Sequence, residues 1–142
     1  MLRLMEASAS QHRFVCPLTV RTYELDGFRH VNNAVFVQYL EAARGEMIIS
    51  AGLEYADFHR WEAYPVVARL EAEYFCPAHA DDNLEIECRV VETKRTRFTV
   101  QYRIRRIKDD ALILRASTVH AFVRPDGKPV RVPAPFRAAF GF

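Results

Sequence analysis

Paired cysteines are what the sequence most clearly lacks. It has three, Cys16, Cys76 and Cys88, which are widely spaced and form no C-x-x-C motif. The spacing therefore predicts neither a disulfide framework nor a zinc site, and we expect no metal. Glycine and proline are also scarce, at 5 and 7 residues. They form no linker between two halves of the chain, and a length of 142 residues fits one domain.

Long apolar runs and an excess of one charge are missing as well. No stretch reaches the roughly 18 apolar residues of a membrane-spanning helix, and residues 1–14 have no continuous apolar segment like that of a signal peptide. Lys and Arg number 20 against 18 for Asp and Glu, so the net charge is only +2. That balance does not indicate a nucleic-acid binder. We therefore expect a cytoplasmic protein that neither inserts into a membrane nor binds nucleic acid.

Enough apolar residues are present to build a core, at 50% of the chain. Their periodicity predicts one strand, one long helix over 34–51, and then four more strands. The predicted strands span 13–22, 65–75, 84–90, 98–104 and 111–123. Pro17 cannot donate a hydrogen bond within a sheet, so we place the first strand at a sheet edge.

These elements predict an α+β fold. Short links join the last three strands, which must therefore run antiparallel. The helix is apolar over more than one face, so it has to be enclosed by other elements. We expect one face of a curved sheet to wrap around it and the other face to be polar. Residues 1–12 have the composition of a flexible arm, which leaves 13–142 as the folded domain.

The densest polar segment lies directly before the helix and reads D-G-F-R-H-V-N-N from Asp26 to Asn33. A helix N-terminus offers unpaired N–H groups that can hold a developing oxyanion. Together with a carboxylate a few residues upstream, it supplies the minimum for acyl-transfer hydrolysis. The same residues also suit plainer roles, with Asp26 forming a turn and Asn32 or Asn33 capping the helix.

The segment D-x-x-x-H-V-N-N, with Phe36 and then Y-L-E-x-A-R from Tyr39, resembles the hotdog-fold thioesterases of the 4-hydroxybenzoyl-CoA thioesterase/YbgC-like superfamily. E-Y-F-C-P-A from Glu73 and D-N-L-E-I from Asp82 extend the resemblance, which covers 13–142. It implies a five-stranded antiparallel sheet wrapped around one long central helix. It also implies an acyl-CoA thioesterase that releases a free acid and coenzyme A.

The resemblance assigns a role to each residue of the segment. Asp26 would attack the thioester carbonyl or activate a water molecule, and the main-chain N–H of Asn33 would polarise the carbonyl oxygen. The side chains of His30, Asn32 and Asn33 would orient the carboxylate, the water or the start of the helix.

Two residues depart from the family pattern. Arg29 stands where glycine is common, and Phe36 stands where tyrosine is usual. Phe36 makes the expected acyl site more apolar, and we place Tyr39 beside it as a second substrate-binding residue.

The resemblance also implies the partners. The substrate is a small-molecule acyl-CoA, and because coenzyme A is part of that substrate no separate cofactor is expected. Its phosphates would meet Lys94, Arg95 and Arg97, although these residues also fit a solvated hairpin tip. Hotdog proteins are dimers or tetramers in which the second strands pair across a two-fold axis, with substrate at the interface, so we expect a homo-oligomer.

Several alternatives stay open at this point. Glu41 on the helix could be an alternative or auxiliary carboxylate, or could simply pair with Arg44 three residues later. The substrate could be an acyl-ACP instead of an acyl-CoA. The chain could also be a hotdog module that binds acyl-CoA without hydrolysing it. A nucleic-acid role for the basic stretch 103–108 ranks well behind these.

Overall fold

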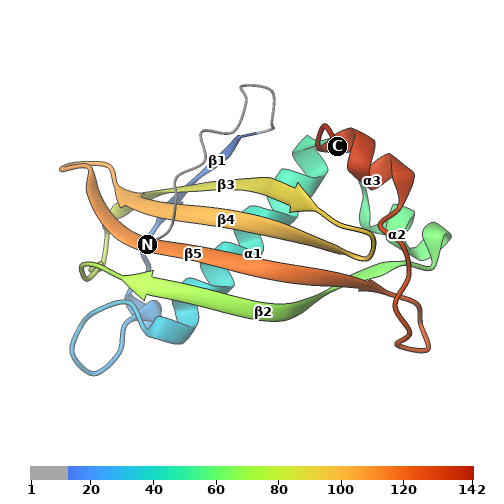
Figure 1. The fold of residues 1–142 in the computed structure, drawn as a ribbon. Coiled ribbons are helices and arrows are strands. Elements are labelled where there is room, and N and C mark those ends of the chain that lie inside the picture. Colours follow the sequence, from blue (N-terminus) through green and yellow to red (C-terminus); the bar gives the residue numbers. More distant parts are fainter. Residues whose placement is uncertain (1–12) are drawn as a thin grey trace.

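The computed structural model describes residues 13–142, so the predicted arm at 1–12 lies outside the described residues. Figure 1 shows a long helix, α1, lying against one face of a five-stranded sheet. In chain order the elements are β1 (Phe14–Thr19), the short 3-10 helix η1 (Thr22–Glu24), α1 (Asn33–Ser50), α2 (Tyr55–Trp61), β2 (Tyr64–Tyr74), β3 (Asn83–Thr93), β4 (Arg97–Arg106), β5 (Ala111–Val123) and α3 (Ala134–Ala139).

The sheet has the order β1-β3-β4-β5-β2, and every neighbouring pair is antiparallel. β1 lies at one edge, with Pro17 opposite Glu85 of β3, as the proline predicted. β2 forms the other edge, although it precedes β3 in the chain. The predicted α+β fold, a five-stranded antiparallel sheet packed on one long helix, is confirmed.

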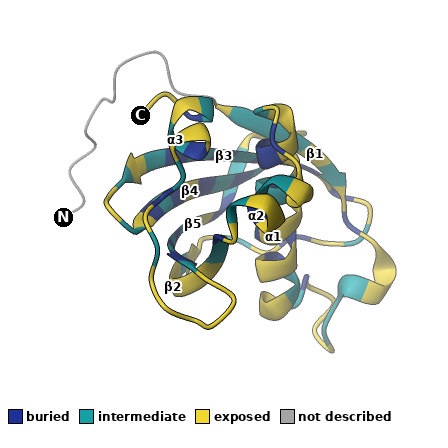
Figure 2. Cartoon of the chain, turned by 90° about the vertical axis from the view of Figure 1, so that its right-hand side faces the viewer, coloured by how far each residue is buried: buried dark blue, intermediate teal, exposed yellow. Residues whose placement is uncertain are grey.

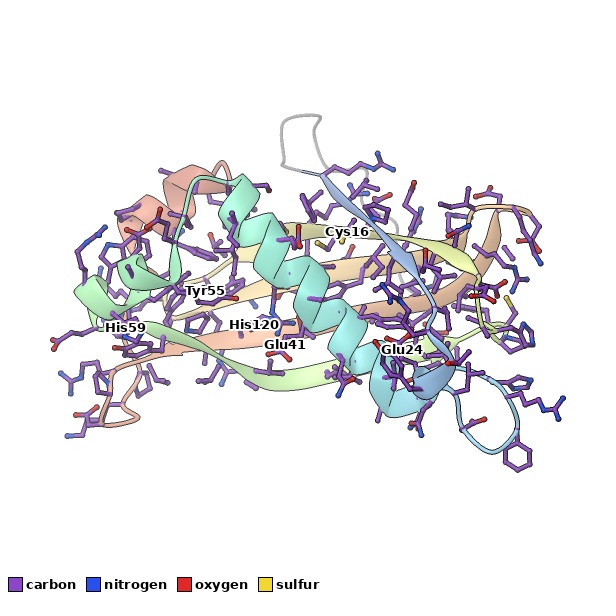
Figure 3. All side chains as sticks on the ribbon, turned by 180° about the vertical axis from the view of Figure 1, so that it is seen from behind. Cys16, Glu24, Glu41, Tyr55, His59 and His120 are labelled. Carbon is purple, nitrogen blue, oxygen red and sulfur yellow. The ribbon has the colours of Figure 1, made fainter. Side chains whose placement is uncertain are left out.

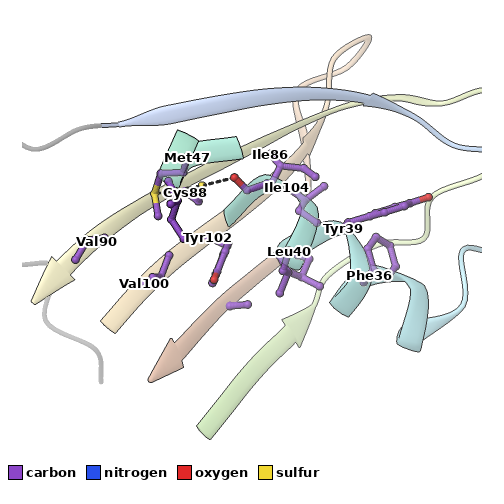
Figure 4. Packing of buried hydrophobic residues seen from close by; sticks show 14 of the residues in the cluster. Phe36, Tyr39, Leu40, Met47, Ile86, Cys88, Val90, Val100, Tyr102 and Ile104 are labelled. Carbon is purple, nitrogen blue, oxygen red and sulfur yellow. Dashed lines mark hydrogen bonds between the residues drawn. The ribbon is translucent and has the colours of Figure 1, made fainter. Parts of the chain in front are cut away.

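The helix α1 begins where the sequence offers an N-cap. Asn32 has extended backbone angles, and its side-chain oxygen accepts a hydrogen bond from the N–H of Ala34. Six residues of α1 are buried: Phe36, Tyr39, Leu40, Ala43, Met47 and Ile48. They pack mainly over β3 and β1, and Figure 4 shows Met47 beside Cys88 of β3. The chain turns away after Ser50 at Gly52, whose φ of 85° is readily adopted only by glycine.

The inner face of β2 is left uncovered by the helix. Val67 and Leu70 lie opposite the buried residues His120 and Thr118 of β5, so they share the face on which α1 packs. Yet Val67 is 50% exposed and Leu70 is 39% exposed. Figure 2 shows β2 largely in the colour of exposed residues, in contrast with β3, β4 and β5. With Tyr74, which is 48% exposed on the same face, these residues form what we call the open strip.

The structure extends the predicted third strand and adds one helix. β3 continues to Thr93, because a register shift between Val90 and Glu92 breaks the alternation on which the prediction rested. Helix α3 was not predicted, since six residues after Pro133 are too few for a helical period to be visible. Its Phe136 is fully buried against Phe98, at 4.6 Å between ring centroids.

Candidate active site

The loop before α1 is held closed by the Asp26 carboxylate. Its Oδ1 accepts hydrogen bonds from the N–H groups of Phe28 (2.8 Å) and His30 (3.2 Å). The main-chain N–H of Asp26 in turn donates to the carbonyl of His30 (2.8 Å). The turn-forming role of Asp26 is therefore present in the structure. The hydrogen bonds that form the turn use only Oδ1, and Oδ2 has no hydrogen-bond partner among residues 13–142.

The loop returns to its starting point before the helix begins. Val31 forms a bridge with Leu25, and its N–H donates to the carbonyl of Ala78 (2.9 Å). The N–H of Asn32 donates to the carbonyl of Glu24 (3.0 Å). The first turn of α1 consequently starts beside the residues that precede Asp26. The loop brings the carboxylate and the helix N-terminus to one end of the molecule.

One N–H group at the helix start has no acceptor. The N–H of Ala34 donates to the Asn32 side chain, and those of Val35 and Phe36 donate to the Asn32 carbonyl at 2.9 and 3.3 Å. The N–H of Asn33 has no acceptor in the described part of the chain. The choice between Asn32 and Asn33 as the cap, open in the sequence, is thus settled for Asn32. Asn33 becomes the first helical residue, with its N–H unpaired within residues 13–142.

Arg29 has a backbone conformation that favours glycine, the residue that the resemblance leads one to expect at this position. Its φ is 63°, in the left-handed region that an arginine enters at a cost of roughly 1–2 kcal/mol. Replacing Arg29 with glycine would remove this cost, but part of the benefit is lost because glycine has more conformational freedom in the unfolded chain. We expect Arg29→Gly to raise the free energy of unfolding by about 0.5–1 kcal/mol, measured by urea denaturation. Arg21→Gly, at a φ of −96°, should lower it, and the prediction is wrong if both variants shift the same way.

His30 meets a residue that the sequence did not single out. Its ring lies edge-on to the ring of His79, at 5.1 Å between centroids. His79 follows the Pro-Ala pair of the loop between β2 and β3, and its N–H donates to the Asp82 carboxylate (2.9 Å). Asp82 is 8% exposed and also lies 3.4 Å from Arg106. The contact between His30 and His79 joins two loops 49 positions apart, and no local pattern could have shown it.

Phe36 and Tyr39 are both buried on the first two turns of α1. The Phe36 ring packs against Tyr39 (5.8 Å) and Tyr74 (5.7 Å). The Tyr74 hydroxyl donates to the carbonyl of Asn33 (3.2 Å), which ties the open strip to the helix start. The Tyr39 hydroxyl donates to the Glu24 carboxylate, and burial together with this bond raises its pKa. Figure 3 shows Glu24 beside the N-terminal end of α1, where its hydrogen bond with Tyr39 fixes the helix to η1.

Lys94, Arg95 and Arg97 lie at the other end of the sheet from Asp26. β4 runs from Arg97 to Arg106, about 30 Å at the rise of a strand, and Arg106 is the end that contacts the loop beside His30. Figure 1 shows the turn between β3 and β4 near α3, far from the loop before α1. The fold of the single chain therefore does not bring these basic residues to the helix start. Lys94 and Arg97 line a shallow depression of about 200 Å³ with Arg69 of β2.

Glu41 and Arg44 do not form the ion pair that their spacing allowed. Neither an ion pair nor a hydrogen bond joins them, and the Arg44 guanidinium instead donates to the Tyr102 hydroxyl at 3.0 Å. Glu41 is exposed on α1. Figure 3 shows it midway along the helix, on the side of β2 and well away from the helix start at Glu24.

Residues 13–142 contain neither a membrane-spanning helix nor a cluster of metal-ligating side chains. None of the helices there has the length and apolar character needed to cross a membrane. Over the same residues, no three or more His, Cys, Asp or Glu side chains gather where they could hold a metal ion.

Comparison with known proteins identifies the family of the chain. The model of a family described as the thioesterase-like superfamily matches residues 20–140. A putative esterase of Aquifex aeolicus is 31% identical over 120 residues, which are 84% of this chain and 91% of that protein. The long-chain acyl-CoA thioesterase FadM of Escherichia coli is 37% identical over 73 residues, 49% of this chain and 52% of FadM.

The chain is also similar to a plant thioesterase and to two solved structures. The chloroplastic acyl-acyl carrier protein thioesterase ATL3 of Arabidopsis thaliana is 28% identical over 87% of this chain, and the chain spans only 65% of its length. A hypothetical protein of Aquifex aeolicus superposes with a TM-score of 0.82 at 28% identity, covering 89% of this chain and 98% of that one. The 1,4-dihydroxy-2-naphthoyl-CoA thioesterase of Synechocystis superposes with a TM-score of 0.83 at 23% identity, covering 90% and 95%, and this likeness supports the fold alone.

Proposed function

The chain belongs to the thioesterase-like superfamily, and on that premise we propose that it hydrolyses an acyl-CoA at the N-terminus of α1. The observation that carries this is the Asn33 N–H without an acceptor, beside a loop that leaves Oδ2 of Asp26 unused. The N–H would stabilise the oxyanion that forms on the thioester carbonyl. Asp26 would take a proton from the attacking water, or attack the carbonyl carbon itself.

The proposed reaction balances with water as the only other reactant. Oxygen adds to the carbonyl carbon, the C–S bond breaks, and the proton removed from water reaches the departing thiolate. His30 and Asn32 are assigned supporting roles. The N–H of His30 holds Oδ1 of Asp26, and the side chain of Asn32 caps the helix whose N-terminus receives the oxyanion.

Thiol release from a panel of acyl-CoAs tests the proposal. Short, medium, long and aryl acyl groups should be offered to the purified protein, with a thiol-reactive dye as the readout. Turnover of one class supports an acyl-CoA thioesterase. Tight binding of acyl-CoA without thiol release across the panel would contradict the proposal and favour a binding module.

An acyl-ACP is the second candidate substrate, because two plant relatives are named as acyl-acyl carrier protein thioesterases. The same acyl group presented on CoA and on acyl carrier protein distinguishes the two. Those relatives are also named as chloroplastic, so the cytoplasmic location expected from the sequence stays a prediction.

We also propose that a second copy of the chain covers the open strip. β2 is an edge strand of 11 residues with an exposed apolar face, which is the kind of edge that pairs with another strand. Pairing along β2 would make a two-fold dimer, in which each contact occurs twice. This is the homo-oligomer that the family resemblance implies.

A charge in the open strip should separate the copies. We expect Leu70→Glu to convert a dimer into a monomer, because the substitution places two carboxylates in one apolar interface. Light scattering after gel filtration measures the mass. Glu71→Gln, next to it on the exposed strand, is the matched control and should stay dimeric. A wild-type protein that is monomeric at all concentrations would overturn the proposed dimer.

A further inference from the structure

A connected row of polar side chains lies beneath α1, in an otherwise apolar core. The Arg44 guanidinium donates to the Tyr102 hydroxyl (3.0 Å), which lies 2.9 Å from the Thr118 hydroxyl. Thr118 in turn lies 2.8 Å from Nε2 of His120. Thr118 and His120 are 1% and 2% exposed, and His120 stacks on Phe98 with 8° between the ring planes. Burying polar groups of this kind carries a desolvation cost, which suggests that the row has a function beyond packing.

The row has a direction, and it is set by Arg44. A guanidinium can only donate, so the Tyr102 oxygen accepts from Arg44 and can pass its own hydrogen to Thr118. Thr118 can then donate to His120, whose ring is neutral because burial and the charge of Arg44 lower its pKa to about 3. The three residues on the sheet therefore hold one N–H of Arg44 and fix its position. None of them neutralises its charge.

Arg44 is left with unused donors and no counter-charge. A guanidinium has five N–H donors, and within residues 13–142 only Tyr102 accepts from it. No carboxylate of the described residues forms an ion pair with it. Glu41, one turn away on the helix, is exposed and forms no ion pair or hydrogen bond with it. A half-buried cation in this state favours an anionic partner from outside the chain.

The open strip lies on the same side of the helix as Arg44. Val37, Glu41 and Arg44 follow helical spacing along one side of α1, and Tyr39 on the other side is bound to Glu24. Leu70 of the open strip is directly opposite Thr118, the centre of the polar row. Figure 3 shows Glu41 on the side of α1 that faces β2. An acyl group that enters at Asn33 and follows this side of the helix reaches Arg44 after about 16 Å.

We propose that Arg44 is a specificity-determining residue that receives a carboxylate at the far end of the acyl group. This rests on the proposed function at the helix start. An unsubstituted hydrocarbon end would remove water from Arg44 and leave its charge unpaired, whereas an ω-carboxylate would pair with it. The preferred substrates are therefore ω-carboxyacyl thioesters. A terminal hydroxyl, which also accepts a hydrogen bond but has no charge, should rank between the two.

Three substrates of equal chain length test this: dodecanoyl-CoA, ω-hydroxydodecanoyl-CoA and dodecanedioyl-CoA. We expect wild-type kcat/KM to favour the dicarboxylic substrate over the unsubstituted one by about 10–100-fold, the range of a charge-assisted hydrogen bond. Arg44→Met keeps the apolar stem and should abolish or reverse this preference. Arg44→Lys should restore part of it. Arg103→Met, on the opposite face of β4 from Tyr102, is the matched control and should keep it.

Binding of non-hydrolysable thioether analogues, followed by calorimetry, separates this inference from the proposed function. If nothing is hydrolysed but the dicarboxylic analogue binds more tightly in wild type than in Arg44→Met, the proposed function fails and the Arg44 site stands. The same ratio of affinities in wild type and Arg44→Met would overturn the Arg44 site. So would an Arg44→Met variant that loses only its dimeric state, because Arg44 would then be an interface contact.

Discussion

Asp26→Asn should reduce kcat for the best acyl-CoA by about 10²–10⁴-fold, the usual contribution of a general base. The substitution is chosen because it spares the loop. An asparagine oxygen can still accept the hydrogen bonds from the N–H groups of Phe28 and His30 that Oδ1 accepts now. The variant therefore loses the charge and basicity of the carboxylate while keeping the turn. KM should change little, because the acyl group does not depend on Asp26 for binding.

A second turn in the same chain provides the control. Asp126 also closes a turn, through a hydrogen bond from the N–H of Lys128 to its Oδ1 (3.0 Å). It follows β5, at the other end of the strand from the loop before α1. Asp126→Asn should retain wild-type turnover, and both variants should melt close to wild type. Near-full turnover by Asp26→Asn would remove this residue from the proposed mechanism and make Glu41 the next carboxylate to replace.

The fold was largely readable from the sequence because its signals are local. The edge position of β1 followed from Pro17, which removes one donor from the sheet. The length of α1 followed from an uninterrupted helical period, and its start followed from two asparagines that can cap a helix. What stayed open locally, the choice between Asn32 and Asn33, was decided by a single side-chain hydrogen bond to Ala34.

The rest depended on contacts between distant segments. His79 lies beside His30 only because the N–H of Val31 pairs with the carbonyl of Ala78. The spacing of Glu41 and Arg44 allows an ion pair between them, but Arg44 instead reaches Tyr102 in the sheet. The spacing of these residues along the chain does not predict either contact.

The location of the basic residues also depends on tertiary structure and not on local sequence. Lys94, Arg95 and Arg97 are neighbours in sequence, and their clustering was easy to see. Whether they face the helix start depends on which end of β4 they occupy, and the strand order puts them at the far end. A role for them in binding CoA phosphates at the proposed site would therefore need a neighbouring copy of the chain.

Asn33→Pro should reduce kcat by about 10²–10³-fold, the effect of losing one donor of an oxyanion hole. Proline is the one residue without a main-chain N–H, and the first helical position is where a helix tolerates it best. The residue before it is also suitable, since Asn32 has a φ of −59° and a ψ of 138°, in the region that proline requires of its predecessor. The carbonyl of Asn33, which accepts from Tyr74, is retained.

Asn33→Ala is the variant against which the proline must be judged. It removes the same side chain and leaves the N–H in place, so the ratio of kcat between the two variants isolates the main-chain donor. The helix should be equally stable in both, because no hydrogen bond within residues 13–142 uses the Asn33 N–H. Melting temperatures that agree within a few degrees would confirm this. Equal kcat values for the two variants would show that the oxyanion is stabilised elsewhere, and the N–H at the start of α1 would lose its proposed role.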